Sequence, residues 1–85
     1  MREFTVDCAG ITDAKALHRL LAETLSFPKW YGHNADALYD CLTDVRVDTT
    51  LTLLHFNDLG DFSAIFRLVL NDCENDNPHL FVNLT

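Results

Sequence analysis

The sequence predicts an α/β fold in which helices pack on a three-stranded parallel sheet, in the order β-α-α-β-α-β. Three segments rich in β-branched, aromatic and leucine residues, at 2–6, 49–56 and 79–84, alternate with segments of helical periodicity. Strands separated by helices are joined by crossovers, which make neighbouring strands parallel. The chain has 85 residues, 48% of them hydrophobic, and is therefore predicted to form a single domain over residues 1–85.

The first predicted strand, residues 2–6, is followed by Gly10 and by a helix. Thr12 and Asp13 both favour the N-cap position, so the helix is predicted to begin near one of them. Its core-facing stripe consists of leucines at helical spacing: Leu17, Leu20, Leu21 and Leu25. Pro28 closes the segment, because proline does not continue a helix.

A short aromatic linker, residues 27–32, leads into a second predicted helix. Asn34 is a good N-cap, and the helix is expected to run to about Thr43. One side is an ordinary core stripe with Leu38, Cys41 and Leu42. The opposite side, at helical spacing, carries Asp36, Tyr39, Asp40 and Thr43.

The rest of the chain is predicted as strand, helix and strand. A polar turn with Gly60 follows the strand at 49–56. The third helix is expected over residues 62–73, with one apolar side: Phe62, Ile65, Phe66, Val69, Leu70 and Cys73. The sequence Asn-Asp-Asn-Pro at 75–78 ends it, and the last strand covers residues 79–84.

The charge of the chain is acidic and unevenly placed. Thirteen Asp and Glu residues outnumber six Lys and Arg, giving a net charge of −7, and the whole imbalance lies downstream of Trp30. Such a surface disfavours direct nucleic-acid binding, which needs cations against phosphate. It suits a basic partner protein; the alternative is a surplus of acids that serves solubility alone.

Signals for membranes, secretion and metals are missing. No apolar run approaches the ~20 residues of a membrane-spanning helix, and acids interrupt the N-terminus where a signal peptide would be apolar. We therefore expect a cytoplasmic protein without a membrane partner. Cys8, Cys41 and Cys73 are far apart and are predicted as small core residues. The four histidines show no ligand spacing either, so no metal and no cofactor are expected.

The polar side of the second predicted helix concentrates like charges. Asp36 and Asp40 stand one turn apart, a spacing that costs about 0.2–0.5 kcal/mol in an isolated helix, and no Lys or Arg within the helix offsets it. Trp30, Tyr31 and Tyr39 are predicted to cluster around the start and the exposed side of this helix. Aromatic side chains beside charges are typical of protein interfaces.

This face has three interpretations: a solvated acidic surface, a surface for a cation-bearing partner, and a catalytic pair formed by Asp36 and Asp40. A catalytic pair needs a cleft whose environment pushes the two pKa values apart. An exposed helix face on so small a domain offers no obvious cleft. The sequence therefore disfavours an enzyme.

Residues 27–43 read Phe-Pro-Lys-Trp-Tyr-Gly-His-Asn-Ala-Asp-Ala-Leu-Tyr-Asp-Cys-Leu-Thr. This segment resembles the signature of the barstar family, the small intracellular ribonuclease inhibitors. The matching positions are Gly32, Asn34, Asp36, Ala37, Leu38, Asp40 and Leu42. The likeness extends over essentially the full chain in element order, size and acidity. It implies the same fold as the periodicity does.

The resemblance also implies a mode of action. The acidic helix would enter the basic active-site cleft of a secreted-type, barnase-like ribonuclease in a one-to-one complex, and its carboxylates would stand in for RNA phosphate. Asp40 would be the central anion, Asp36 the second acidic contact, and Trp30 an aromatic contact before the helix. Further contact positions implied by the family are Gly32, Asn34, Ala35, Tyr39 and Thr43.

The family also uses an acid on its last long helix. Asp72 aligns best with that acid when counted back from the C-terminus, and Glu74 and Asp76 are rival candidates.

Several positions depart from the family pattern. Tyr39 stands where the family usually has Trp, Asp44-Val45 replaces a Gly and an aromatic residue, and His33 replaces an acid. The edges of an interface set its specificity, so these differences leave the target nuclease open. The alternative function is an acidic interaction module of the same fold that binds another toxin or basic partner without inhibiting a nuclease.

Overall fold

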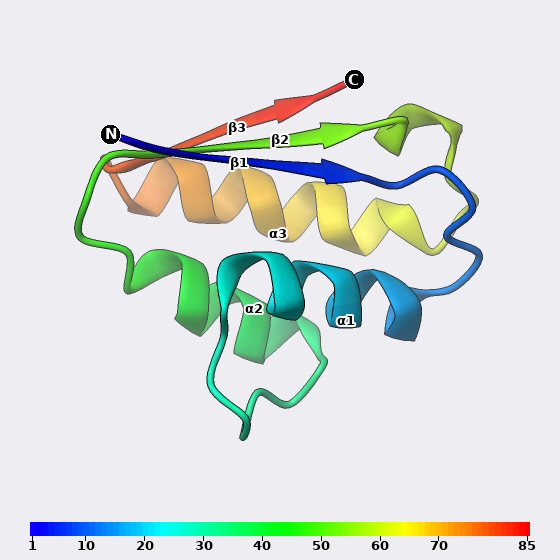
Figure 1. The fold of residues 1–85 in the computed structure, drawn as a ribbon, viewed down its shortest axis with the longest axis horizontal. Helices are drawn as coiled ribbons and strands as arrows, with labels where there is room; N and C mark the ends of the chain where they lie inside the picture. The colour runs from blue at the N-terminus through cyan, green and yellow to red at the C-terminus, as the bar shows by residue number, and fades with distance from the viewer.

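A computed structural model describes residues 1–85 as one parallel sheet with three helices on one of its faces (Figure 1). The strands are β1 (Arg2–Asp7), β2 (Thr49–Leu54) and β3 (Leu80–Leu84), and the helices are α1 (Ala14–Leu25), α2 (Ala35–Thr43) and α3 (Ser63–Asp76). The strand order is β1-β2-β3, and both pairs are parallel. These features confirm the predicted α/β fold and its order of elements.

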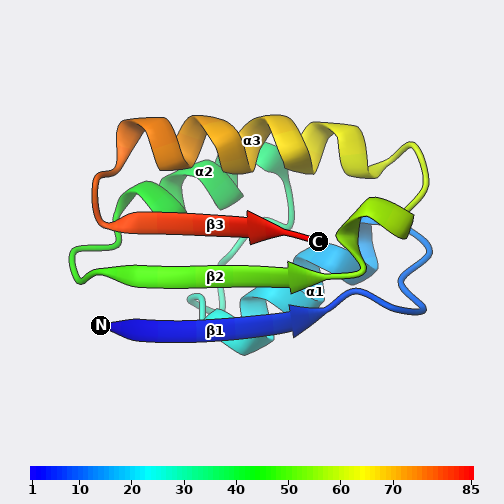
Figure 2. The same ribbon diagram turned by 90° about the horizontal axis from the view of Figure 1, so that it is seen from above.

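The strands run in one direction, so the two chain ends lie at opposite ends of the sheet (Figure 2). Phe4 of β1 is opposite Leu51 of β2, which in turn is opposite Val82 of β3. Because side chains alternate along a strand, these residues share one face and pack on the core beneath the sheet. The residues between them, such as Thr52 and Asn83, face the side that carries no helix.

The core lies between the sheet and the helices. The leucine stripes predicted for the first two helices supply four fully buried residues: Leu17, Leu21, Leu38 and Leu42. Phe66 and Leu70 of α3 meet them from the third helix. This packing fixes which faces of the helices remain outside.

Two boundaries differ from the prediction by more than one residue. The second strand ends at Leu54, because His55 adopts a left-handed conformation (φ 61°) that turns the chain into a short 3₁₀ helix, η1 (Phe56–Asp58). Phe56 is buried there rather than in the sheet. The third helix continues to Asp76, three residues beyond the predicted end, and Asn77 stops it.

Five side chains predicted for the core are not fully buried: Leu20, Leu25, Cys41 and Phe62 are half-buried, and Ile65 is exposed. Ile65 of α3 is 49% exposed, because it lies about 100° around the helix from the buried Phe66. Cys41 of α2 is half-buried, whereas Cys8 and Cys73 are fully buried as predicted. The core stripes of α2 and α3 are therefore narrower than their apolar sequences indicate.

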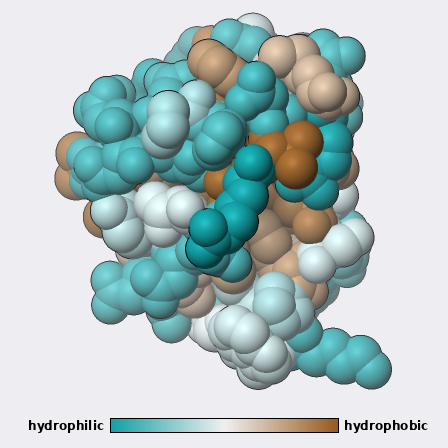
Figure 3. Space-filling view, turned by 90° about the vertical axis from the view of Figure 1, so that its left-hand side faces the viewer, coloured by the Kyte–Doolittle hydropathy of each residue, from teal (hydrophilic) through white to brown (hydrophobic).

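The end of the molecule at which the strands begin is hollowed. Figure 3 shows hydrophobic residues in the middle of this end with hydrophilic residues around them. A cavity of about 400 Å³ opens there, with Phe4, Phe27 and Leu51 among its lining residues. No helix of the structure has the length and apolar character needed to cross a membrane.

Candidate protein-binding face

A capped turn fixes the start of α2. The Oδ1 atom of Asn34 accepts a hydrogen bond from the Ala37 N–H at 2.8 Å, and its Nδ2 donates to the Gly32 carbonyl at 3.2 Å. A Cβ atom on Gly32 would come within 2.8 Å of that Nδ2 atom, so a larger residue would displace the cap. Gly32 and Asn34, both predicted contact residues, therefore shape the beginning of the helix.

The outward face of α2 carries carboxylates without counter-ions. Leu38 and Leu42 are fully buried on the inner side, and Asp36 and Asp40 are exposed on the outer side. Neither acid takes part in an ion pair. The ion pairs of the molecule are Arg46–Asp44, His55–Asp58 and His79–Asp48. Asp36 lies in the first turn, where the helix dipole favours an acid, whereas Asp40 lies too far along to gain much.

A groove of about 420 Å³ opens beside Asp40. Trp30 and Thr43 also line it, and the rest of its wall consists of Ser26, Phe27, Pro28, Cys41 and Asp44. Trp30 is 80% exposed, so its ring is open to contact. Asp36 does not line this groove. The two carboxylates of α2 therefore do not share a cleft as a catalytic pair would.

Tyr31 does not belong to the exposed aromatic group in which it was predicted. It is 4% exposed, its ring packs on Phe27, and its hydroxyl lies 2.7 Å from Nδ1 of the buried His18. Burial raises the pKa of Tyr31 well above its usual range. Burial also lowers the pKa of His18, and the nearby His33 lowers it further. The pair is therefore neutral and belongs to the interior.

Tyr39 is half-buried and faces α3. Its hydroxyl donates a hydrogen bond to the carboxylate of Asp76, and its main-chain carbonyl accepts one from Thr43 Oγ1 at 2.7 Å. The pKa of Tyr39 is raised, first by the hydrogen bond to Asp76, then by burial and by nearby charges that include Asp72. The phenol is therefore held in its protonated form, as a donor.

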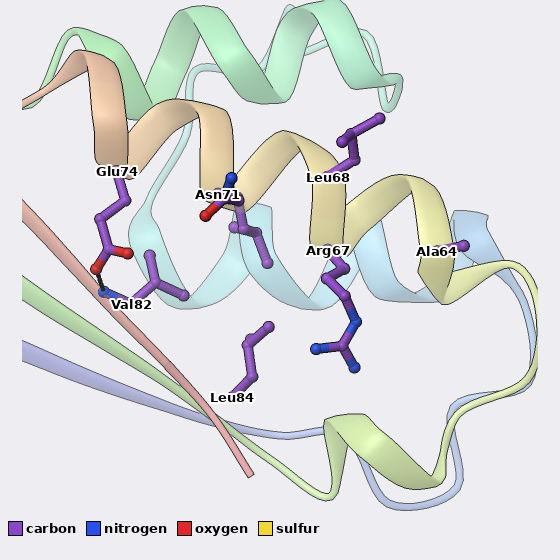
Figure 4. A pocket seen from close by; sticks show the side chains of 8 residues that line it. Ala64, Arg67, Leu68, Asn71, Glu74, Val82 and Leu84 are labelled. Carbon is purple, nitrogen blue, oxygen red and sulfur yellow. Dashed lines mark hydrogen bonds between the residues drawn. The ribbon is translucent and has the colours of Figure 1, made fainter.

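The three acids near the end of α3 point in different directions. Glu74 Oε2 accepts the Val82 N–H at 2.7 Å, so it faces β3 and borders a pocket of about 450 Å³ between α3 and that strand (Figure 4). Asp76 accepts the Tyr39 hydroxyl. Asp72 is exposed and has neither a hydrogen bond nor an ion pair. The contacts thus distinguish three residues that the sequence left as rivals.

Two residues that the sequence did not indicate as contact residues also shape this face. Asp44 lines the groove with Asp40, and its position one turn beyond Asp40 is the signal that identifies it. Asn77 is 4% exposed, and its Nδ2 donates to the carbonyls of Leu42 and Val45, both at 2.9 Å. The sequence presents Asn77 only as part of a helix-ending segment.

Residues 1–83 match the family model described as "Barstar (barnase inhibitor)". The chain belongs to the barstar family. It is also similar to a Bacillus subtilis (strain 168) protein named "Putative ribonuclease inhibitor YrdF", with 44% identity over 67 residues that cover 78% of this chain and 69% of that protein. Barstar membership confirms the resemblance carried by residues 27–43. It indicates an inhibitor of a ribonuclease rather than an enzyme.

Proposed function

We propose that this protein inhibits a basic, barnase-type ribonuclease by placing α2 in the active-site cleft of the enzyme, in a one-to-one complex. The observation that carries the proposal is the pair Asp36 and Asp40, exposed on one face of α2 without a counter-ion. A ribonuclease needs a cationic site for the phosphate of RNA, and a helix that presents two carboxylates is complementary to such a site. Barstar membership supports the same conclusion.

Asp40 is proposed as the central anion because it lines the groove beside the exposed Trp30 ring. Arginine can bind a carboxylate through two parallel hydrogen bonds, and such a pair strengthens when water is excluded. Trp30 would supply that exclusion, and Asp36 would hold a second cation one turn away. The remaining proposed contacts are Gly32, Asn34, Ala35, Tyr39, Thr43 and Asp72.

The domain organisation, location and partners that we propose follow from this role. We propose that residues 1–85 act as one domain in the cytoplasm, where an inhibitor can neutralise a nuclease before its export. The contact is with the enzyme alone, without direct binding to nucleic acid or membrane and without a cofactor. Complexes of barnase and barstar are themselves a reference case for charge steering. The fold-changes that we expect in affinity and association rate are those typical of that class of complex.

The deciding experiment titrates a barnase-type ribonuclease with the wild-type protein and with Asp40→Ala, at low and moderate salt. We expect stoichiometric inhibition by the wild type and an affinity loss of at least about 30-fold in Asp40→Ala, because the cation of the enzyme is left buried and unpaired. Asp61→Ala is the matched control, since it removes an exposed acid before the start of α3, away from the groove.

Two results would contradict the proposal. Equal affinity of Asp40→Ala and Asp61→Ala would remove Asp40 from the centre of the contact. No inhibition at high micromolar protein would favour the alternative, an acidic module that binds another toxin or basic partner. Affinity capture with the wild-type protein and with Asp40→Ala would then identify partners that depend on this face.

A further inference from the structure

We propose that Asp76 is a positioning residue of the binding face: its carboxylate holds Tyr39 against α3 and leaves Asp72 as the acid of α3 that meets the partner. The inference rests on the proposed function, because it divides roles among residues of the same face. It separates two acids that stand one turn apart, Asp72, which aligns best with the acid of the family, and its rival candidate Asp76.

Contacts hold Tyr39 both at its hydroxyl and at its main-chain carbonyl. Its hydroxyl donates to Asp76, and its main-chain carbonyl accepts from Thr43 Oγ1 at 2.7 Å and lies 4.0 Å from Cys73 Sγ. Residues Asp76 and Cys73 both belong to α3, so one tyrosine of α2 joins the two helices at its ring end and at its backbone. Its ring position is therefore set by α3 as well as by its own helix.

The end of α3 is a costly place for carboxylates. The helix dipole disfavours an acid in the last turn, and no basic residue there compensates. Asp72 and Asp76 also repel each other, because like charges one turn apart on a helix face one another. For Asp76 the Tyr39 hydroxyl is a compensating contact within the protein. Asp72 has none, and a cation of the partner can supply it.

Holding Tyr39 matters because of its place in α2. The residue directly precedes Asp40 and lies one turn after Asp36. A free tyrosine ring at this position would exchange among rotamers and would have to be ordered when the partner binds. Ordering a mobile side chain at an interface costs affinity, and a contact made in advance removes that cost. Asp76 thus prepares the face without touching the partner.

A double-mutant cycle tests this division of roles. The variants are Tyr39→Phe, Asp76→Ala and the combination of the two, with association and dissociation rates measured against a barnase-type ribonuclease. We expect each single change to weaken affinity by roughly threefold to tenfold, mainly through faster dissociation. The double variant should be no weaker than either single variant. Asp76→Asn should retain most of the wild-type affinity, because its amide oxygen still accepts a hydrogen bond from the Tyr39 hydroxyl.

Asp72→Asn serves as the contrasting variant. We expect it to slow association, to reduce the dependence of association on salt, and to add to the effect of Tyr39→Phe. If Asp76→Ala slows association in the same way, Asp76 is a contact residue and the proposal is wrong. Additive effects of Tyr39→Phe and Asp76→Ala would overturn it as well.

A measurement on the free protein tests the contact between Tyr39 and Asp76 independently of inhibition. The titration of the Tyr39 ring, followed by ¹³C NMR, should show a raised pKa in the wild type that falls toward 10 in Asp76→Ala and stays raised in Asp61→Ala. A wild type that does not inhibit refutes the proposed function and this inference with it. An inhibiting wild type whose cycle shows no coupling refutes only the role of Asp76.

Discussion

Single side chains create two contrasting electrostatic environments in this protein, one exposed and charged, the other buried and neutral. On the outer face of α2, Asp36 and Asp40 are solvated and unpaired. Between α1 and the linker before α2, His18 and Tyr31 are buried and hydrogen-bonded to each other. The first condition favours a cationic partner. The second makes the stability of the fold depend on the neutral state of one histidine.

The stability should fall when the protein is acidified. The pKa of His18 is lowered in the folded state, first by burial and then by His33, so the unfolded chain binds the proton more readily. This contribution to stability is present above pH 6.5, the unperturbed value, and is lost as the pH falls through the lowered pKa. Urea unfolding at a series of pH values should show a weaker loss in His18→Gln. Asn75→Ala, at an exposed position without a titratable side chain, should keep the wild-type profile.

Asn77 is expected to be a stability residue rather than a contact residue. Asn77→Ala leaves the Val45 carbonyl without the donor that Asn77 supplies and removes one donor from the Leu42 carbonyl, and should lower the free energy of unfolding by about 1–3 kcal/mol. Asn75→Ala changes an exposed position two residues earlier and should stay within about 0.5 kcal/mol. Equal effects in urea unfolding would show that the Asn77 bonds contribute nothing.

At the scale of elements, the proposed binding face combines residues of three segments. The linker supplies Trp30, α2 supplies Asp36 and Asp40, and α3 supplies Asp72 together with the contact that fixes Tyr39. The cap at the start of α2 joins the linker to the helix. Its strength therefore affects both the fold and the orientation of the carboxylates.

Removing the cap should weaken α2. Asn34→Ala is expected to lower the free energy of unfolding by about 0.5–2 kcal/mol, because the Ala37 N–H loses its acceptor. Asn34→Ser should retain most of the stability, since serine is also a good cap. Chemical denaturation with an unchanged m-value measures the effect. A serine variant as unstable as the alanine variant would point to the bond with the Gly32 carbonyl instead.

The prediction of the elements succeeded where burial follows a local period. Leu17 and Leu21, or Leu51 and Leu53, are buried because helical and strand periods place them on one face. The prediction was wrong where a backbone torsion ended a strand, and where the buried side of a helix was narrower than its apolar sequence indicated. His55 ends β2 by its left-handed conformation, and Ile65 is half exposed because it lies about 100° around α3 from the buried Phe66.

At the scale of the whole molecule, the net charge of −7 should govern how fast the partner is met. We expect the association rate with a barnase-type ribonuclease to fall by about tenfold or more between low and high salt, because screening weakens charge steering. The dissociation rate should change less. Stopped-flow fluorescence of Trp30 can follow both rates. An association rate independent of salt would contradict charge steering.

The sequence by itself determined the α/β fold, the acidic face of α2 and the family of the protein, because these depend on residue type and spacing along the chain. Only the tertiary structure decided that Tyr31 is buried against His18, and that Glu74, Asp76 and Asp72 face β3, Tyr39 and solvent respectively. The direction of a side chain depends on the partners that folding brings to it. Residues far apart in the chain, such as Tyr39 and Asp76, carry no sign of each other in their local pattern.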